Sequence, residues 1–184
     1  PYIGREFHGI WGNFDVHIHL PEGYGIGATG VKQSTTSSPM PTGLPGTIHH
    51  YKASNVIDFA WAADPDFIEE AVDVDGVTLR LIHQANAEID SNWTVLADYA
   101  AQAMAYMNED IGPYMYPEYT VIQGGDGGME YPMITLITGE RSLRSLVGVT
   151  VHEMAHSWFQ GMVATNDSLH EWMDEGFTCL LYTS

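Results

Sequence analysis

The sequence has little cysteine, few basic residues and no long apolar run. Its one cysteine, Cys179, allows no internal disulfide and no zinc site built from several thiolates. No apolar stretch approaches the roughly 20 residues that a helix needs to span a bilayer, so we expect no membrane insertion. Scarce cysteine suits the cytoplasm as well as a bacterial periplasmic or secreted protein, and the compartment therefore stays open.

Two common catalytic patterns are also missing. The glycine run at residues 124–128 has no Lys-Ser or Lys-Thr end and leads to a strand, so it is not a phosphate-binding loop. The sequence contains no G-x-S-x-G nucleophile motif. These absences exclude P-loop nucleotide chemistry and the serine chemistry of the α/β-hydrolases.

Acidic residues greatly outnumber basic ones. The 24 Asp and Glu against six Lys and Arg give a formal net charge of -18. A field of that sign repels nucleic acid and acidic lipid surfaces, and it attracts cationic ligands such as the free amino terminus of a peptide. A need for solubility alone also explains this charge. With 45% hydrophobic and 11% aromatic residues, the chain can still bury a core.

The N-terminal third has the patterns of a β structure. Apolar and polar residues alternate over residues 14–20, which predicts a half-buried strand with His17 and His19 on its polar face. These histidines could hold a metal, but solvated strand residues are the simpler interpretation. The Ser, Thr, Pro and Gly content of residues 32–46 predicts a mobile loop, and residues 55–61 predict a second strand.

The Pro and Asp cluster at residues 63–66 predicts a domain boundary, after which strands and helices are mixed. A long helix is expected from Ser91, which can cap it, to about Asp110. Its buried side should carry Trp93, Leu96, Ala97, Ala100, Met104 and Met107. Further strands are expected at residues 77–82, 119–122 and 133–138, a loop at 123–130, and helices from Ser142 to about Gln160 and from about Ser168 onward.

The H-E-x-x-H pattern at residues 152–156 carries the chemistry. Positions four apart lie on one face of a helix, so the His152 and His156 imidazoles can reach a single ion. Glu153 lies beside that ion, where it can take a proton from a water on the metal. The alternative is two helix histidines satisfied by ordinary hydrogen bonds.

Two further features favour the metal. The pattern lies in a strongly apolar helix, where burying two histidines and a glutamate would be costly without a partner. Glu175 lies 19 positions after His156 on a following helix and can supply the third ligand, which leaves a fourth position open as catalytic zinc requires. Its neighbour Asp174 is a candidate to hydrogen-bond a ligand.

Larger motifs around these residues resemble a known family. Residues 152–156 (HEMAH), 18 intervening residues and Glu175 resemble the gluzincin zinc signature. Residues 172–177 (WMDEGF) are similar to the M1 aminopeptidase family, and residues 127–131 (GGMEY) resemble its G-x-M-E-N exopeptidase motif. Residues 55–61 (NVIDFAW) resemble the last strand of its saddle-like N-terminal β domain.

The resemblance implies an α+β fold in two parts. Residues 1–64 would be the C-terminal part of the N-terminal β domain, and residues 65–178 the first part of a thermolysin-like zinc peptidase domain. The chain would thus be a truncated fragment. The family's transition-state tyrosine would lie beyond it, so we expect the fragment alone to be inactive.

The resemblance also implies a site. One zinc ion would be held by His152, His156 and Glu175, with Glu153 as general base. Glu130 would bind the α-ammonium of a peptide with a free N-terminus, helped by the neighbouring Gly127, Gly128 and Met129. This makes the chain part of a zinc-dependent aminopeptidase that takes residues from the N-termini of peptides. A zinc endopeptidase and a non-catalytic M1-like scaffold are the alternatives.

Two features depart from simple expectations. Tyr131 replaces the motif's Asn, which would alter the pocket for the first side chain of the substrate. Residues 179–184 (CLLYTS) are encoded by the DNA string TGT CTC TTA TAC ACA TCT. This string is the transposase end used in sequencing libraries. We therefore expect these six residues to derive from a sequencing adapter, and a read amplified directly from source DNA to lack them. The alternative is that they are ordinary helix residues.

Overall fold

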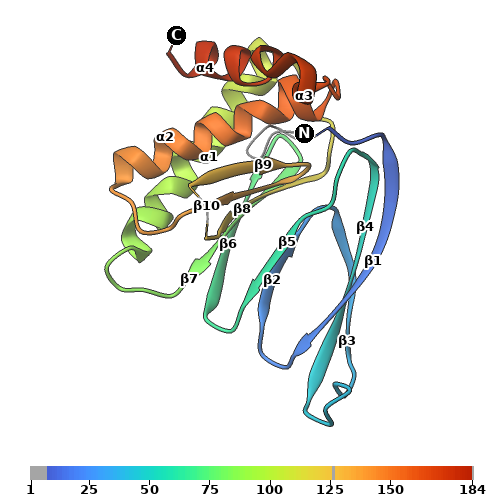
Figure 1. Ribbon diagram of the computed structural model, residues 1–184. Coiled ribbons are helices and arrows are strands. Elements are labelled where there is room, and N and C mark those ends of the chain that lie inside the picture. The colour runs from blue at the N-terminus through green and yellow to red at the C-terminus, as the bar shows by residue number, and fades with distance from the viewer. Residues whose placement is uncertain (1–7, 126, 184) are drawn as a thin grey trace.

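The computed structural model describes residues 8–125 and 127–183, with side chains up to Leu180. Helices gather at one end of the molecule, and the strands of the N-terminal half extend away from them toward the other end (Figure 1). Within the described residues, the strands form three separate sheets. Separate sheets combined with helices make an α+β fold, as expected from the sequence.

The N-terminal part is antiparallel. One sheet has the order β1-β4-β3, and a two-stranded sheet pairs β2 with β5. The strand expected at residues 14–20 is confirmed, because Ile18 and Leu20 are buried while His17 is exposed. The strands are β1 (Gly12–Pro21), β2 (Gly25–Ala28), β3 (Val31–Ser37), β4 (Gly46–Val56) and β5 (Trp61–Asp64).

The loop expected at residues 32–46 is wrong in its first half, which forms most of β3. This strand has no buried residue, so it carries none of the apolar alternation that signals a strand in a sequence. It forms at the edge of its sheet because β4 supplies hydrogen-bonding partners along most of its length. β-branched Thr35 and Thr36 suit the extended backbone.

The strand expected at residues 55–61 is also wrong. β4 ends at Val56 and β5 begins at Trp61, and Asn55 has a positive φ of 55° that breaks the extended run. The Pro and Asp cluster forms the turn at residues 65–66, where the chain passes from β5 to β6 and so from one sheet to the next. The domain boundary near residue 64 stays a prediction.

A five-stranded mixed sheet carries the rest of the fold. β7 and β10 both run parallel to β8, and β6 and β9 are antiparallel edge strands, in the order β6-β7-β8-β10-β9. The strands expected at residues 77–82, 119–122 and 133–138 are confirmed to within a few residues. β6 was not expected, and β9 replaces the end of the expected loop. The strands are β6 (Phe67–Val74), β7 (Val77–Gln84), β8 (Glu118–Gln123), β9 (Gly128–Tyr131) and β10 (Ile134–Ile137).

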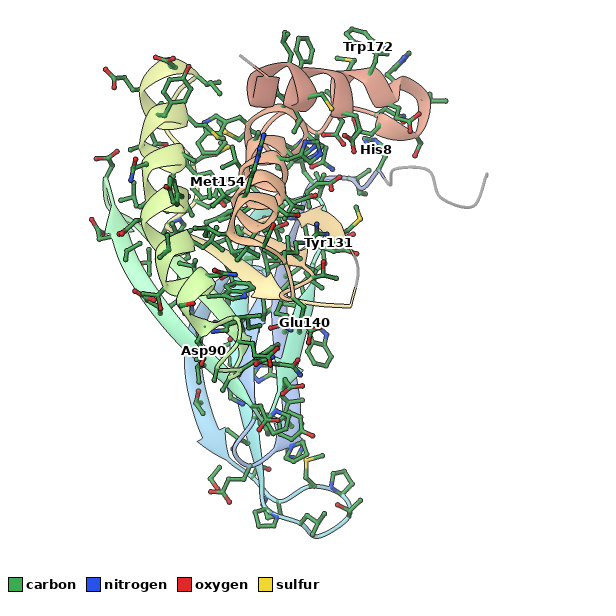
Figure 2. The ribbon with its side chains drawn as sticks, turned by 90° about the vertical axis from the view of Figure 1, so that its left-hand side faces the viewer. His8, Asp90, Tyr131, Glu140, Met154 and Trp172 are labelled. Carbon is green, nitrogen blue, oxygen red and sulfur yellow. The ribbon has the colours of Figure 1, made fainter. Side chains whose placement is uncertain are left out.

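Helix α1 (Asp90–Asp110) packs on this sheet and on α2. The predicted buried side is confirmed in full: Trp93, Leu96, Ala97, Ala100, Met104 and Met107. The predicted Ser91 cap is wrong, since the helix begins one residue earlier and its N-cap, Ile89, makes no side-chain capping hydrogen bond. Met154 of α2 belongs to the same core and lies toward α1 in Figure 2.

The C-terminal helices are more broken than expected. α2 (Leu143–His156) begins after Ser142 as predicted, but it passes into a π-helical turn, η1 (Ser157–Gly161). The prediction of a single last helix is wrong, because three short segments replace it. The chain bends at Asp174, between the second and the third segment. The segments are α3 (Asp167–His170), η2 (Glu171–Met173) and α4 (Glu175–Thr183). Trp172 points outward from this region (Figure 2).

The segment assigned to a sequencing adapter begins in α4. Cys179 and Leu180 are exposed on α4, and the remainder of the segment assigned to an adapter has no described side chains, with Ser184 outside the described residues. The adapter origin stays a prediction. Among the described residues, no helix is both long and apolar enough to cross a bilayer.

Candidate metal centre

The two histidines of the H-E-x-x-H pattern lie in the last turns of α2, next to the first residue of α4. α2 contacts both α4 and β9, so three elements meet at this point. The bend at Asp174 starts α4 at Glu175 and directs this carboxylate toward His152 and His156. The structure thus brings together three side chains that are separated by up to 23 positions in the sequence.

The three candidate ligand atoms converge. Nε2 of His152 lies 3.3 Å from Nε2 of His156 and 3.4 Å from Oε2 of Glu175. Nε2 of His156 lies 3.9 Å from Oε1 of Glu175. Ligand atoms about 2.0–2.1 Å from a tetrahedral zinc ion are about 3.3–3.4 Å apart, so this donor set fits zinc with only small adjustments.

The site is buried on one side and open on the other. The His156 side chain is 1% exposed, whereas those of His152 and Glu175 are 24% and 38% exposed. Three protein ligands with an accessible side are the arrangement of catalytic zinc sites, in which the fourth position takes water or substrate.

Asp174 fixes the orientation of the His156 ring. The Nδ1–H of His156 donates to the fully buried Asp174 carboxylate, which leaves Nε2 to face His152 and Glu175. Burial lowers the pKa of His156, but the hydrogen bond to Asp174 and the nearby carboxylates outweigh this effect and raise the pKa to about 9. A carboxylate behind a ligating imidazole sets its tautomer and raises its basicity.

Glu153 lies beside the ligands and is buried, at 5% exposed. Gly128 of β9 approaches it closely, since a Cβ at this position would lie 2.1 Å from Oε1 of Glu153. The second glycine of the GGMEY motif therefore leaves room for the Glu153 carboxylate. The motif on β9 and the H-E-x-x-H pattern on α2 are in direct contact.

Glu130 lies on β9 opposite Thr135 of β10, and it is buried, at 7% exposed. Its carboxylate is within 4.8 Å of ligating atoms of His156 and Asp174. Among the described residues, no group hydrogen-bonds its Oε1 atom. Burial raises the pKa of Glu130 to about 9, although His156 nearby acts in the opposite direction.

The remaining motif residues make backbone contacts. The carbonyl of Gly127 accepts a hydrogen bond from Nη2 of Arg141 at 2.6 Å, and that of Met129 accepts one from Oγ1 of Thr135 at 3.0 Å. Tyr131 and Glu130 line a small cavity beside His156. The substrate contacts expected of Gly127, Gly128 and Met129 stay predictions.

Sequence reasoning missed two supporting residues. Thr178 is fully buried, and its Oγ1 lies 3.3 Å from Nδ1 of His156, on the same side as Asp174. Its spacing of one helical turn from Asp174 was the available signal. Arg141 also bonds Oγ1 of Thr138 and Oγ of Ser145, and so ties the start of β9 to the start of α2. No sequence pattern marks that role.

Known proteins are similar to this chain in sequence. No protein-family model matches the chain. Aminopeptidase B of Rattus norvegicus is 36% identical over 76 residues, which are 36% of this chain and 11% of the relative. Leucine aminopeptidase 2 of Emericella nidulans is 29% identical over 177 residues, or 91% of this chain and 27% of the relative.

A solved structure shares the fold over almost the whole chain. The M1 zinc metallopeptidase of Deinococcus radiodurans, solved as a mutant, superposes with a TM-score of 0.77 and 19% identity. The match covers 95% of this chain and 41% of that one. The chain spans about a tenth to a quarter of the length of the two curated relatives. Together, these comparisons show that the chain has the fold of an M1 zinc metallopeptidase and is similar in sequence to proteins named aminopeptidase.

Proposed function

We propose that the protein containing this chain is a zinc-dependent aminopeptidase, which hydrolyses the first peptide bond of substrates with a free N-terminus. The observation that carries the proposal is the convergence of His152, His156 and Glu175, whose donor atoms lie 3.3, 3.4 and 3.9 Å apart. Relatives named aminopeptidase support the same activity.

Two imidazoles and one carboxylate are a donor set of catalytic zinc. When bound, the ion supplies a Lewis acid that polarises the scissile carbonyl and makes a water molecule more acidic. His156 holds its place through the bond from Nδ1 to Asp174. The more exposed His152 and Glu175 leave a path for substrate on their side.

Glu153 is the general base in this proposal. Its position one residue after His152 places it at the site without making it a ligand, and its burial keeps bulk water away from the carboxylate. Glu153 accepts a proton from the attacking water and then donates it to the nitrogen of the leaving peptide. Such a shuttle restores the carboxylate at the end of each cycle.

Glu130 binds the α-ammonium of the substrate. A buried carboxylate whose Oε1 atom lacks a hydrogen bond in the described residues is unfavourable unless a cation compensates it. The substrate's ammonium supplies that cation. Because Glu130 and His156 lie in one cluster, the ammonium is held at a set distance from the reacting carbonyl.

The two alternatives make different demands on these residues. A zinc endopeptidase has no use for a buried carboxylate such as Glu130 beside the metal ligands. A non-catalytic scaffold has no use for Glu153 or for the opening beside His152. The three proposed metal ligands, Glu153 and Glu130 lie together, and this combination favours the aminopeptidase.

Peptides with a free or an acetylated N-terminus distinguish the aminopeptidase, the endopeptidase and the non-catalytic scaffold. The full-length protein should cleave a peptide with a free N-terminus and should fail on its N-acetylated form, because acetylation removes the cation that Glu130 binds. Glu130→Gln should reduce this discrimination and lower kcat/KM for the free peptide. Equal cleavage of both peptides by the unmodified protein would establish the endopeptidase, and no cleavage of either by zinc-loaded protein would favour the scaffold.

A further inference from the structure

A second group of possible metal ligands lies on the N-terminal sheet, on strands β1 and β4 and away from α2 and α4. His17 and His50 are directly opposite each other in the antiparallel register, and Asp15 is opposite Lys52. Residues two apart in a strand point to the same face, so all four side chains share one face of the sheet. Residues from both strands are thus brought together by register alone.

The donor atoms of three of these residues already lie close together. Oδ1 of Asp15 is 2.6 Å from Nε2 of His50 and 3.6 Å from Nε2 of His17. One ligand atom from each residue lies within 4.8 Å of the others. The His17 and His50 rings are stacked, with centroids 4.1 Å apart and planes at 10°.

We propose that Asp15, His17 and His50 form a metal site for a divalent transition ion, separate from the centre on α2. Two imidazoles and one carboxylate suit zinc, nickel or copper rather than calcium or magnesium, which take oxygen ligands. Donors at about 2.0–2.2 Å from such an ion are separated by about 3.3 Å, so the two distances from Oδ1 of Asp15 to the imidazole nitrogens need to change by less than an ångström.

The site can open because it is solvent-accessible. The side chains of Asp15 and His17 are 57% and 59% exposed, and His50 is 19% exposed. To point two nitrogens at one ion, the His17 and His50 rings must splay apart from their stacked arrangement. The exposed His17 ring is the one that is free to turn.

Lys52 competes with the ion. Its Nζ lies 3.1 Å from Oδ2 of Asp15 and supplies the positive charge that a metal would otherwise bring. An ion at this position would bridge β1 to β4 and thereby stabilise the sheet against unfolding.

Nickel titration tests the site, with full-length protein that has no polyhistidine tag and that has been dialysed after zinc loading until about one zinc ion per chain remains. Loss of a residue that merely supports a metal ligand typically costs about 10–100-fold in affinity, so His17→Ala and His50→Ala, which remove ligands, should weaken Ni²⁺ binding at least that much. Lys52→Met should strengthen it, because the competing ammonium is gone. His19→Ala is the matched control, since His19 lies on the same face of β1 but bonds the Ser38 carbonyl instead.

The outcomes are distinct. The site is supported if Ni²⁺ binds, if His17→Ala and His50→Ala weaken this binding, and if His19→Ala does not change it. Ni²⁺ should then also raise the melting temperature. Absence of Ni²⁺ binding beyond the catalytic zinc site overturns the proposal, and so does binding that is equal in the two histidine variants and the unmodified protein. Peptidase activity should be unchanged in all four variants.

Discussion

Each ring nitrogen of His156 has a separate task. Nδ1–H donates to Asp174, so Nε2 is the nitrogen that faces His152 and Glu175 and that must be free of its proton when a metal binds. The tautomer needed for metal binding is therefore set by a buried carboxylate that is not itself among the proposed ligands. Thr178, at 3.3 Å from the same Nδ1, closes this side of the ring.

Asp174→Asn should weaken zinc binding by about 10–100-fold, because an amide no longer provides the negative charge that orients His156 and raises its basicity. The measurement is a competition titration of the full-length protein against a zinc chelator. Glu171→Gln, an exposed acid three residues earlier, is the control and should bind zinc as the unmodified protein does. Equal zinc affinity in Asp174→Asn and the control would remove Asp174 from this role.

Glu153→Gln should retain zinc and lose most turnover. Glutamine keeps the shape of the side chain but cannot accept a proton, and loss of a general base typically costs about 10²–10⁴-fold in rate. Steady-state kinetics on a free N-terminal peptide, with zinc content measured on the same sample, checks this. A kcat near that of the unmodified protein in the zinc-loaded variant is the result that the proposal does not allow.

Much of the site follows from local sequence, but not all of it. His152 and His156 are four apart on one helix, so their convergence requires no knowledge of the fold. Glu175 depends on a bend at Asp174 that breaks the expected single helix. Glu130 reaches the site because β9 pairs with β10, and only the resemblance to a family predicted its position. Spacing along the chain says nothing of such pairings.

At the scale of elements, Arg141 connects three parts of the centre. Its guanidinium bonds the carbonyl of Gly127 before β9, Oγ1 of Thr138 after β10 and Oγ of Ser145 in the first turn of α2. These contacts hold the strand that carries Glu130 against the helix that carries the histidines. Arg141 is a positioning residue and does not contact the proposed ligands in these bonds.

Arg141→Ala should lower kcat/KM for free N-terminal peptides several-fold while zinc content stays the same. The physical reason is that β9 loses the donors that fix its start, so Glu130 is held less firmly near the metal ligands. Arg144→Ala, at an exposed arginine in the first turn of α2, is the control and should leave the kinetics unchanged. Identical kinetic constants in the two variants would show that β9 does not need this connection.

The elements that the sequence predicts best are those with a one-sided apolar pattern. All six residues expected on the buried side of α1 are buried, because a helix with one apolar stripe has one way to pack. β3 and β6 lack such a pattern: β3 has no buried residue, and β6 has Val74 alone. Both form at sheet edges because a neighbouring strand offers hydrogen bonds, and that pairing is not visible in the local sequence.

At the scale of the whole molecule, the helices that carry the metal centre gather at one end, and the N-terminal strands extend from there toward the other end (Figure 1). The formal charge of -18 surrounds a site that is proposed to take a cationic substrate group, so the long-range field and the local carboxylate act in the same direction. The His17 and His50 cluster shows how the same fold creates a second set of ligands from residues 33 positions apart. Only the strand register brings these two side chains together.

Zinc content of the full-length protein is the most direct test of the central claim. After dialysis against metal-free buffer, the unmodified protein and a His17→Ala control should both retain about one zinc ion per chain and full peptidase activity. Glu175→Ala should lose both, because two histidines alone hold the ion too weakly. Zinc content and activity that are unchanged in Glu175→Ala would contradict the account.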